Sequence, residues 1–435
     1  MPKQLIFVAL NEFNVQLLNE AADLFALPHL KQALTLLHQR KTVTSDVYDS
    51  GYLEPWVQWV SIHTGTPSTE HKIKHLGDVK SNTKEQLWEQ LNRNGISSGI
   101  WGAMNATRGS ADHCSFFLPD PWTFDEKAFP REINAFLGLP RYMARNYLNP
   151  KIHVLFGLLL KFAVFMCRPR AVIAFIKALP YFLWYAVKYK AANFVTYSFA
   201  EYLSTIRFLD YWKRDKPSFS LVFLNLVAHA QHYYWTDVPL AQNDKLKYTF
   251  TFLDKILGVL FATVGKDADI LIANGLTQIN TNSEAPWIMY RQNDHLSFLN
   301  KIGIVPLRVE ACMTHDAHLF FRDQADRDKA LAILQSVKVG PKKFFYLEEY
   351  PAEPLKLFYM LEFTDPSDAL TEITWAGGSI KMLDWFTPII RRTAKHLGTG
   401  IALSTSDMLP DLPFPNHGIH DVILRFFGIS RSEAS

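Results

Sequence analysis

The chain has 435 residues, of which 48% are hydrophobic and 14% aromatic, so it can bury one large α/β domain with an insertion, or two domains. Its formal net charge of +3 gives no argument for a nucleic acid or another polyanion as a partner. The three cysteines are odd in number and lack metal-type spacing, which indicates free thiols in a reducing compartment.

The N-terminal residues predict a buried strand rather than a targeting segment. Gln4 to Leu10 is a short apolar run, typical of a parallel strand, and Asn11-Glu12 ends it. The run is too short and too quickly polar for a signal peptide, so we expect a cytoplasmic protein. Residues 15–37 follow with helical periodicity, which would place polar side chains at the carboxyl end of the first strand.

An aromatic segment near residue 60 predicts a buried helix. Trp56 to Ile62 is apolar, and Thr64-Gly65-Thr66-Pro67 ends it with turn residues. A strand is expected before it at 43–48. After it we expect a helix at 84–92, a strand at 99–102 and an extended segment at 116–121, where two prolines exclude a regular helix.

Residues 134–216 differ from the rest of the chain in charge. Between Arg141 and Lys216 there are thirteen Lys and Arg against three Asp and Glu, a net +10, which leaves −7 for the remainder. The two apolar runs, 154–167 and 171–187, are interrupted by basic residues and prolines, and neither reaches the length that spans a bilayer. Two interpretations remain open: a helical cap on the core, or a basic interfacial helix pair that contacts an anionic membrane or a lipid-linked substrate.

The remaining segments alternate between strands and helices. Strands are expected at 219–226, 269–273, 318–321 and 400–404, and helices at 245–264, 326–335 and 421–428. This alternation predicts an α/β fold with a mostly parallel sheet flanked by helices.

Several motifs resemble the alkaline phosphatase superfamily, in the branch of type I phosphodiesterases, nucleotide pyrophosphatases and sulfatase-like proteins. The segment from Ser61 to His71 fits the pattern S-I-H-T-G-x-P-x-x-x-H that follows the family nucleophile, and V-A-L-N-E-F from Val8 resembles its first strand. The resemblance implies an alkaline-phosphatase-like core from 1–133 and 217–435, with 134–216 as a helical, basic insertion.

The family's two-metal site is depleted in this chain. Asn11 stands where the family has Asp, Glu54-Pro55 where it has the nucleophile, Ala228 where it has the Asp of D-x-x-x-H, and Asn274 where it has the Asp of D-H-G. The resemblance leaves two remnant ligands, His232 and His396. Neutral amides offset a divalent charge poorly, so we expect at most one divalent ion such as zinc, and favour none.

The substituted positions nevertheless keep polar residues, and a decayed site would more often fill with apolar ones. One carboxylate among several imidazoles can perform acid–base chemistry near neutral pH. The expected catalytic residues are Glu54, His229 and His232, and the expected substrate-binding residues are Asn11, Glu12, Asn274, Gln278 and His417.

Two functions remain open. The first is a divergent phosphodiesterase- or sulfatase-like hydrolase or transferase acting on a small-molecule, sugar- or lipid-linked phosphate, without nucleic acid. The second is a catalytically inactive binding protein with the same fold. Either is compatible with peripheral attachment of 134–216 to an anionic surface at the inner face of the membrane.

Overall fold

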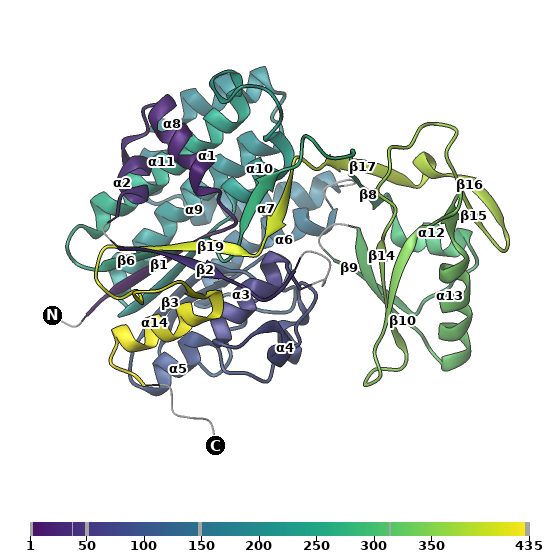
Figure 1. The fold of residues 1–435 in the computed structure, drawn as a ribbon, viewed down its shortest axis with the longest axis horizontal. Helices are drawn as coiled ribbons and strands as arrows, with labels where there is room; N and C mark the ends of the chain where they lie inside the picture. The colour runs from purple at the N-terminus through teal and green to yellow at the C-terminus, as the bar shows by residue number, and fades with distance from the viewer. Residues whose placement is uncertain (1–2, 37, 48–51, 147–149, 313–314, 431–435) are drawn as a thin grey trace. The chain divides into compact units, whose positions relative to one another are not determined.

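The computed structural model describes residues 3–36, 38–47, 52–146, 150–312 and 315–430 (Figure 1). The chain forms two compact units. The first consists of residues 1–142, 151–281 and 393–435, and the second of residues 143–150 and 282–392. The sequence-based boundaries did not separate 282–392 from the core.

An eight-stranded sheet forms the centre of the first unit. Its strands, in spatial order, are β20 (Phe414–Pro415), β2 (His38–Val43), β19 (Thr399–Ser404), β6 (Asp269–Ala273), β1 (Leu5–Leu10), β5 (Phe219–Leu224), β3 (Ser98–Ala103) and β4 (Cys114–Pro119). All neighbouring pairs are parallel except those of β19, which runs antiparallel to both β2 and β6. The α/β class with a mostly parallel sheet is therefore confirmed.

The register of the three central strands aligns their carboxyl ends. Leu10 of β1 is opposite Leu224 of β5, and Ala9 is opposite Ala273 of β6. Each strand is followed at once by a polar residue, so side chains that are far apart in sequence meet at one edge of the sheet. β1 is buried along its whole length because helices cover both faces of the sheet.

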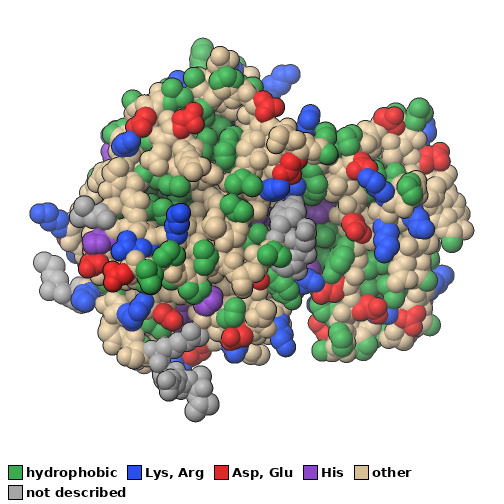
Figure 2. All heavy atoms as spheres, in the orientation of Figure 1, with side chains coloured by type: hydrophobic (Ala, Val, Ile, Leu, Met, Phe, Trp, Pro, Cys, Tyr) green, Lys and Arg blue, Asp and Glu red, His purple; other side chains and the backbone are tan. Residues whose placement is uncertain are grey.

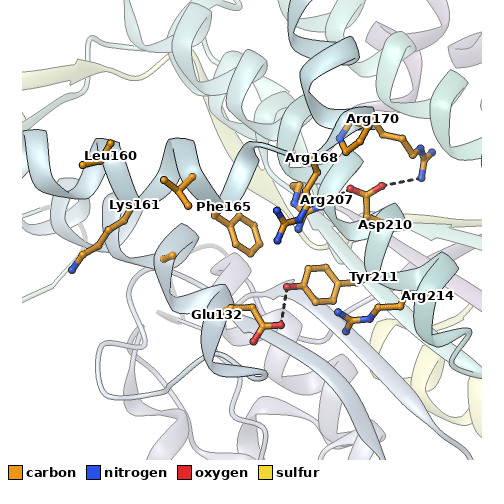
Figure 3. A pocket seen from close by; sticks show the side chains of 13 residues that line it. Glu132, Leu160, Lys161, Phe165, Arg168, Arg170, Arg207, Asp210, Tyr211 and Arg214 are labelled. Carbon is orange, nitrogen blue, oxygen red and sulfur yellow. Dashed lines mark hydrogen bonds and ion pairs between the residues drawn. The ribbon is translucent and has the colours of Figure 1, made fainter.

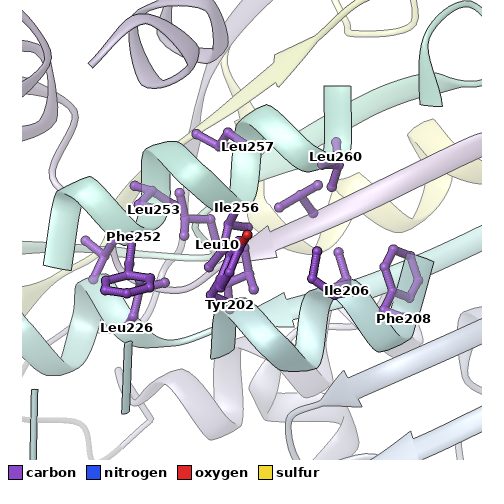
Figure 4. Packing of buried hydrophobic residues seen from close by; sticks show 14 of the residues in the cluster. Leu10, Tyr202, Ile206, Phe208, Leu226, Phe252, Leu253, Ile256, Leu257 and Leu260 are labelled. Carbon is purple, nitrogen blue, oxygen red and sulfur yellow. The ribbon is translucent and has the colours of Figure 1, made fainter. Parts of the chain in front are cut away.

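Helices cover the two faces of this sheet in two layers (Figure 1). One layer contains α1 (Val15–Leu24), α2 (Pro28–Leu34), α8 (Pro169–Lys188), α9 (Asn193–Asp215), α10 (Leu226–Tyr234) and α11 (Asp244–Val264). The other contains α3 (Pro55–Thr64), α4 (Ser68–His71), α5 (Leu87–Arg93) and α14 (Ile419–Phe426). Figure 4 shows side chains of α9 and α11 packed against each other and against the sheet, with Tyr202, Ile206 and Leu253 among the buried ones.

Residues 134–216 are mainly helical. They form α6 (Asn134–Asn146), α7 (Ile152–Met166), α8 and α9. Among the described residues, α8 is the one helix that is long and apolar enough to cross a membrane by length and composition, with a mean hydropathy of 1.4. The apolar run 171–187 predicts a segment too short to span a bilayer, whereas the helix also includes Pro169, Arg170 and Lys188.

The second unit has its own hydrophobic core, centred on Phe298, Phe344 and Phe386. One sheet has the strand order β13 (Phe345–Glu349), β14 (Lys356–Leu361), β10 (Asp316–Phe320) and β9 (Arg308–Ala311). A second sheet has the order β12 (Lys342–Lys343), β11 (Lys338–Val339), β15 (Glu372–Trp375) and β16 (Gly378–Lys381). The unit also contains the strand pair β8 (Ile288–Gln292) and β17 (Phe386–Arg391) and the helices α12 (His295–Lys301) and α13 (Gln324–Ser336).

Two predicted elements need correction. The single periodic segment at 15–37 is two helices, because Ala26 adopts a left-handed backbone (φ 51°) and Pro28 then begins a new helix. The strand expected at 43–48 lies earlier, at His38–Val43. Tyr48 lies outside the described residues.

Candidate functional site

Three polar residues meet where the central strands end. Asn11 follows β1, Asn225 follows β5 and Asn274 follows β6. The Asn11 Nδ2 group donates to Asn225 Oδ1 at 2.8 Å and to Glu12 Oε1 at 2.8 Å. The indole nitrogen of Trp59 donates to Asn11 Oδ1 at 2.7 Å, so the amide is fully engaged and holds the edge of the sheet together.

Glu12 lies at the centre of this edge. Its backbone is left-handed (φ 55°), an uncommon conformation for a residue with a side chain, and it turns a buried carboxylate across the strand ends. Glu12 Oε2 lies 3.0 Å from His232 Nε2 and 3.0 Å from His396 Nε2, and it accepts a hydrogen bond from Gln278. One carboxylate thus contacts two imidazoles and the amides of Asn11 and Gln278.

The fold brings the two histidines to Glu12 from different directions. His232 stands in the last turn of α10, the helix that follows β5. His396 lies on β18 (Ala394–Leu397), which pairs with β7 (Thr277–Asn280) so that His396 is opposite Gln278. Because β19 runs antiparallel, the residues just before it lie at the edge where the parallel strands end.

Glu54 completes the line of charged side chains. It is the N-cap of α3, but its side chain makes no capping hydrogen bond. Instead Glu54 Oε2 lies 3.3 Å from His396 Nδ1, which is also 3.1 Å from the Leu53 carbonyl oxygen. The side chain of Glu54 is 35% exposed, whereas that of Glu12 is 3% exposed. We call Glu12, Glu54, His232 and His396 the Glu12 cluster.

The charges of this cluster stabilise one another. Burial alone would raise the pKa of Glu12, but His396 and His232 hold it well below its usual value. Burial alone would lower the pKa of His396, but the carboxylates of Glu12 and Glu54 hold it well above the usual value. His396 therefore forms an imidazolium between two carboxylates.

The same side chains could hold one cation. The ligand atoms of Glu12, His232 and His396 all lie within 4.8 Å of one another, and a carboxylate with two imidazoles is a donor set that zinc accepts. His396 Nε2 is buried and lies 3.0 Å from Glu12 Oε2, so an ion bound there would take the place of the proton on this nitrogen. Among the described residues, this is the one group of three such side chains close enough to share an ion.

The other predicted site residues have different surroundings. The His229 ring stacks between Tyr197 and Tyr233, and desolvation lowers its pKa to about 4, so it is a neutral, half-buried imidazole. The Asn274 side chain bonds Phe13 and Ile401 backbone groups and fixes the edge of the sheet. His417 lies in the short turn Asn416–Gly418, where its backbone N–H donates to Asn416 Oδ1.

Sequence reasoning missed two parts of the network. Asn225 directly follows β5, but the predicted strand covered 219–226 and so included it. Glu201 lies on α9 and accepts hydrogen bonds from the backbone N–H groups of Asn225 and Leu226. Burial raises the pKa of Glu201 to about 7, and nothing in its helical sequence context indicates this role.

No protein-family model and no curated protein matches the chain. Phosphonoacetate hydrolase from Sinorhizobium meliloti 1021, in complex with phosphonoformate, is similar in structure at 13% identity and a TM-score of 0.46, over 98% of this chain and 96% of that chain. Human ectonucleotide pyrophosphatase/phosphodiesterase 5 is similar at 10% identity and a TM-score of 0.44, over 100% and 97%. A mutant of TAB5 alkaline phosphatase with magnesium bound is similar at 11% identity and a TM-score of 0.40, over 99% of each chain.

All three belong to the alkaline phosphatase superfamily, which the sequence motifs of this chain also resemble. At such low identity and TM-score, the likeness does not establish a shared activity.

Proposed function

We propose that this protein is a hydrolase or transferase for a phosphate-containing substrate, with Glu54 as its general base. The observation that carries the proposal is the line Glu54–His396–Glu12, in which a partly exposed carboxylate contacts a buried imidazole that in turn contacts a buried carboxylate. Such a line orients the outer carboxylate and leaves its free oxygen able to take a proton from water or a substrate hydroxyl.

Each residue of the cluster has a separate task in this proposal. Glu54 accepts the proton of the attacking group. His396 holds the Glu54 carboxylate in place, and Glu12 holds His396. His232, whose side chain is 24% exposed, donates a hydrogen bond to a phosphoryl oxygen or to the leaving group.

A single divalent ion is compatible with this site. Glu12, His232 and His396 would hold it, and it would supply Lewis acidity toward a phosphoryl oxygen. An imidazole that binds a metal must give up its proton at the ligating nitrogen, so a proton and an ion compete for His396. We expect at most one ion per chain.

The test compares the wild-type protein with Glu54→Gln on a panel of phosphate mono- and diesters. The change removes charge at nearly constant shape, so we expect turnover to fall about 10²- to 10⁴-fold with little change in unfolding free energy. Glu20→Gln, on the outer surface of α1, is the matched control and should keep full turnover. Unchanged turnover in Glu54→Gln would exclude the general-base role.

A binding protein is the second candidate function. The observation that favours it is the engagement of both strand-end amides, Asn11 and Asn274, in hydrogen bonds within the protein. Calorimetric binding of a phosphate ester, without turnover and weakened by Glu54→Gln, would select this function.

A further inference from the structure

Helix α8 has two apolar faces, and only one of them is covered. Ala171, Ala174, Ala178 and Tyr185 are buried, and the helix packs against α9. Ile173, Ile176, Trp184 and Val187 lie on the opposite face and are exposed, Trp184 by 69% and Val187 by 82%. Their spacing of three to eight residues places them on a single stripe of the helix.

Helix α7 repeats this pattern. Ile152, Phe156, Leu160 and Val164 are exposed, Ile152 by 83% and Phe156 by 70%, at spacings of four residues. Phe165 is buried, and its ring packs near Phe136 and Tyr211. Large side chains exposed in such stripes on two consecutive helices are unusual for a surface that faces only water. Figure 2 shows hydrophobic side chains at the surface over the helical layer that carries α8 in Figure 1.

A cationic pocket lies beside these stripes. It has a volume of about 760 Å³ and is lined from α7, α8 and α9 and from the start of α6. Five of its lining residues are basic and two are acidic, namely Lys161, Arg168, Arg170, Arg207 and Arg214 against Glu132 and Asp210. Phe165, Leu160 and Val164 give it an apolar wall.

Arg214 is paired with Asp215 by two hydrogen bonds of 2.7 and 2.8 Å, whereas Arg207 is only partly satisfied by protein partners. Arg170 and Arg207 share the single carboxylate of Asp210, at 3.2 Å and 2.5 Å (Figure 3). Arg207 Nε is buried and has no hydrogen-bond partner among the described residues. The guanidinium of Arg207 lies over the Phe165 and Tyr211 rings, at 4.7 Å and 5.5 Å from their centroids, which holds it in place. The pocket therefore favours a group with negative charge.

We infer that α7 and α8 form a docking surface for an anionic phospholipid membrane, with the arginine-lined pocket receiving a lipid phosphate. Exposed apolar stripes would enter the acyl boundary of one leaflet, and the basic side chains between and beside them would meet the anionic headgroups. An apolar stripe beside an excess of positive charge is complementary to an anionic membrane. It is less complementary to a protein partner or to a second copy of the chain.

The helices lie in the plane of the interface in this arrangement. Crossing the bilayer would require α8 to leave α9 and the core, because its alanine face is packed there. Lys177 and Pro180 also interrupt its apolar sequence. Attachment by one leaflet keeps the first unit folded and buries the exposed stripes.

The test is co-sedimentation of the full chain with two kinds of vesicle. One kind contains phosphatidylcholine alone, and the other contains about 30% phosphatidylglycerol to give an anionic surface. We expect binding to the anionic vesicles at low salt, and a loss of about tenfold or more when ionic strength rises from roughly 0.05 to 0.5 M. Equal recovery on both kinds of vesicle would overturn the inference.

Matched variants separate the two parts of the surface. Trp184→Glu and Phe156→Glu should each weaken vesicle binding about tenfold or more, since each removes a large apolar side chain from the bilayer. Leu370→Glu, an exposed leucine of the second unit, is the control and should bind as wild type. Lys161→Glu should weaken binding to anionic vesicles, whereas Lys301→Glu on α12 should not.

Two further measurements address other occupants. About 10 mM inorganic phosphate, compared with chloride at equal ionic strength, should lower vesicle binding only slightly, because phosphate competes for the pocket alone and leaves the apolar stripes in the bilayer. Complete release by phosphate, and not by chloride, would show that a site for free phosphate carries the binding. A dimer in sedimentation velocity that Trp184→Glu dissociates, without vesicle binding, would show that a second copy covers this face. Either result would overturn the inference.

Discussion

The Glu12 cluster and the α7–α8 surface both gather charge, but they hold it in opposite ways. At the strand ends, a buried carboxylate has a named partner on each side, and its partners come from four separate segments of the chain. On α7, α8 and α9, five basic side chains line a pocket beside exposed apolar side chains, and two of them, Arg170 and Arg207, share the carboxylate of Asp210. The first arrangement fixes the positions of individual side chains, whereas the second gives a surface its positive charge and apolar character.

This difference has a consequence for substitutions. Removing one member of a buried, mutually paired set leaves the others uncompensated, so its effect falls on stability as well as on chemistry. Removing one member of an exposed surface changes what the surface binds and leaves the fold nearly unaffected.

Glu12→Gln should have the largest effect on stability. The imidazoles of His232 and His396 would lose their central carboxylate, and the His396 ring is only 11% exposed, so we expect the unfolding free energy at pH 6 to fall by about 3–5 kcal/mol. Urea denaturation measures this directly, with Glu20→Gln as the control, for which we expect a change within about 0.5 kcal/mol. A loss below about 1 kcal/mol would mean that the pairing contributes little to the fold.

Glu201→Gln should change how the stability of the protein depends on pH. The pKa of Glu201 is raised to about 7 by burial, so the folded state keeps its proton where the unfolded state has lost it. The contribution of Glu201 to the stability of the wild-type protein therefore falls as pH rises from the pKa of this group in the unfolded state toward 7. Relative to wild type, the variant should gain about 3 kcal/mol between pH 4.5 and pH 8, measured by denaturation at each pH. A pH-independent difference would contradict the raised pKa.

His396→Gln should destabilise the protein by an amount that depends on pH. The folded pKa of His396 is raised, so its stabilising contribution is complete below the unfolded pKa and is lost as pH rises through the folded pKa. The cost of the substitution should therefore be largest below about pH 6.5, and shrink above it by up to about 1.4 kcal/mol per pH unit. His113→Gln, at an exposed loop position, should show no such trend.

Trp184→Glu should have the smallest effect on the fold. The side chain is 69% exposed, so we expect the unfolding free energy to change by no more than about 0.5 kcal/mol while vesicle binding is lost. Thermal and urea denaturation in the absence of lipid provide the check. A large destabilisation would mean that this face is covered in the folded protein.

The sequence predicted the sheet better than it predicted the centre of the site. Apolar runs located β1, β5 and β6, because buried parallel strands need continuous hydrophobic residues. The polar residue after each strand was then expected at a common edge, which is where Asn11 and Asn274 lie.

Pairings inside the site depend on backbone details that the sequence does not display. Glu12 reaches two histidines because its backbone is left-handed, and His396 reaches the same edge because β19 runs antiparallel. The sequence-based pairing of Glu54 with His229 or His232 therefore differs from the contact that the structure shows, between Glu54 and His396. His229 faces two tyrosine rings instead.

The charge state of His396 tests the account most directly. In metal-free protein at pH 7.5, imidazole nitrogen–proton NMR spectra, assigned with His396→Gln, should show both ring nitrogens of His396 protonated. In the same spectra His229, whose pKa is lowered to about 4, should be neutral. Introducing Glu12→Gln should lower the pKa of His396, since the largest stabilising charge is removed. A neutral His396 at pH 7.5 in the wild-type protein would contradict the charged line from Glu54 to Glu12.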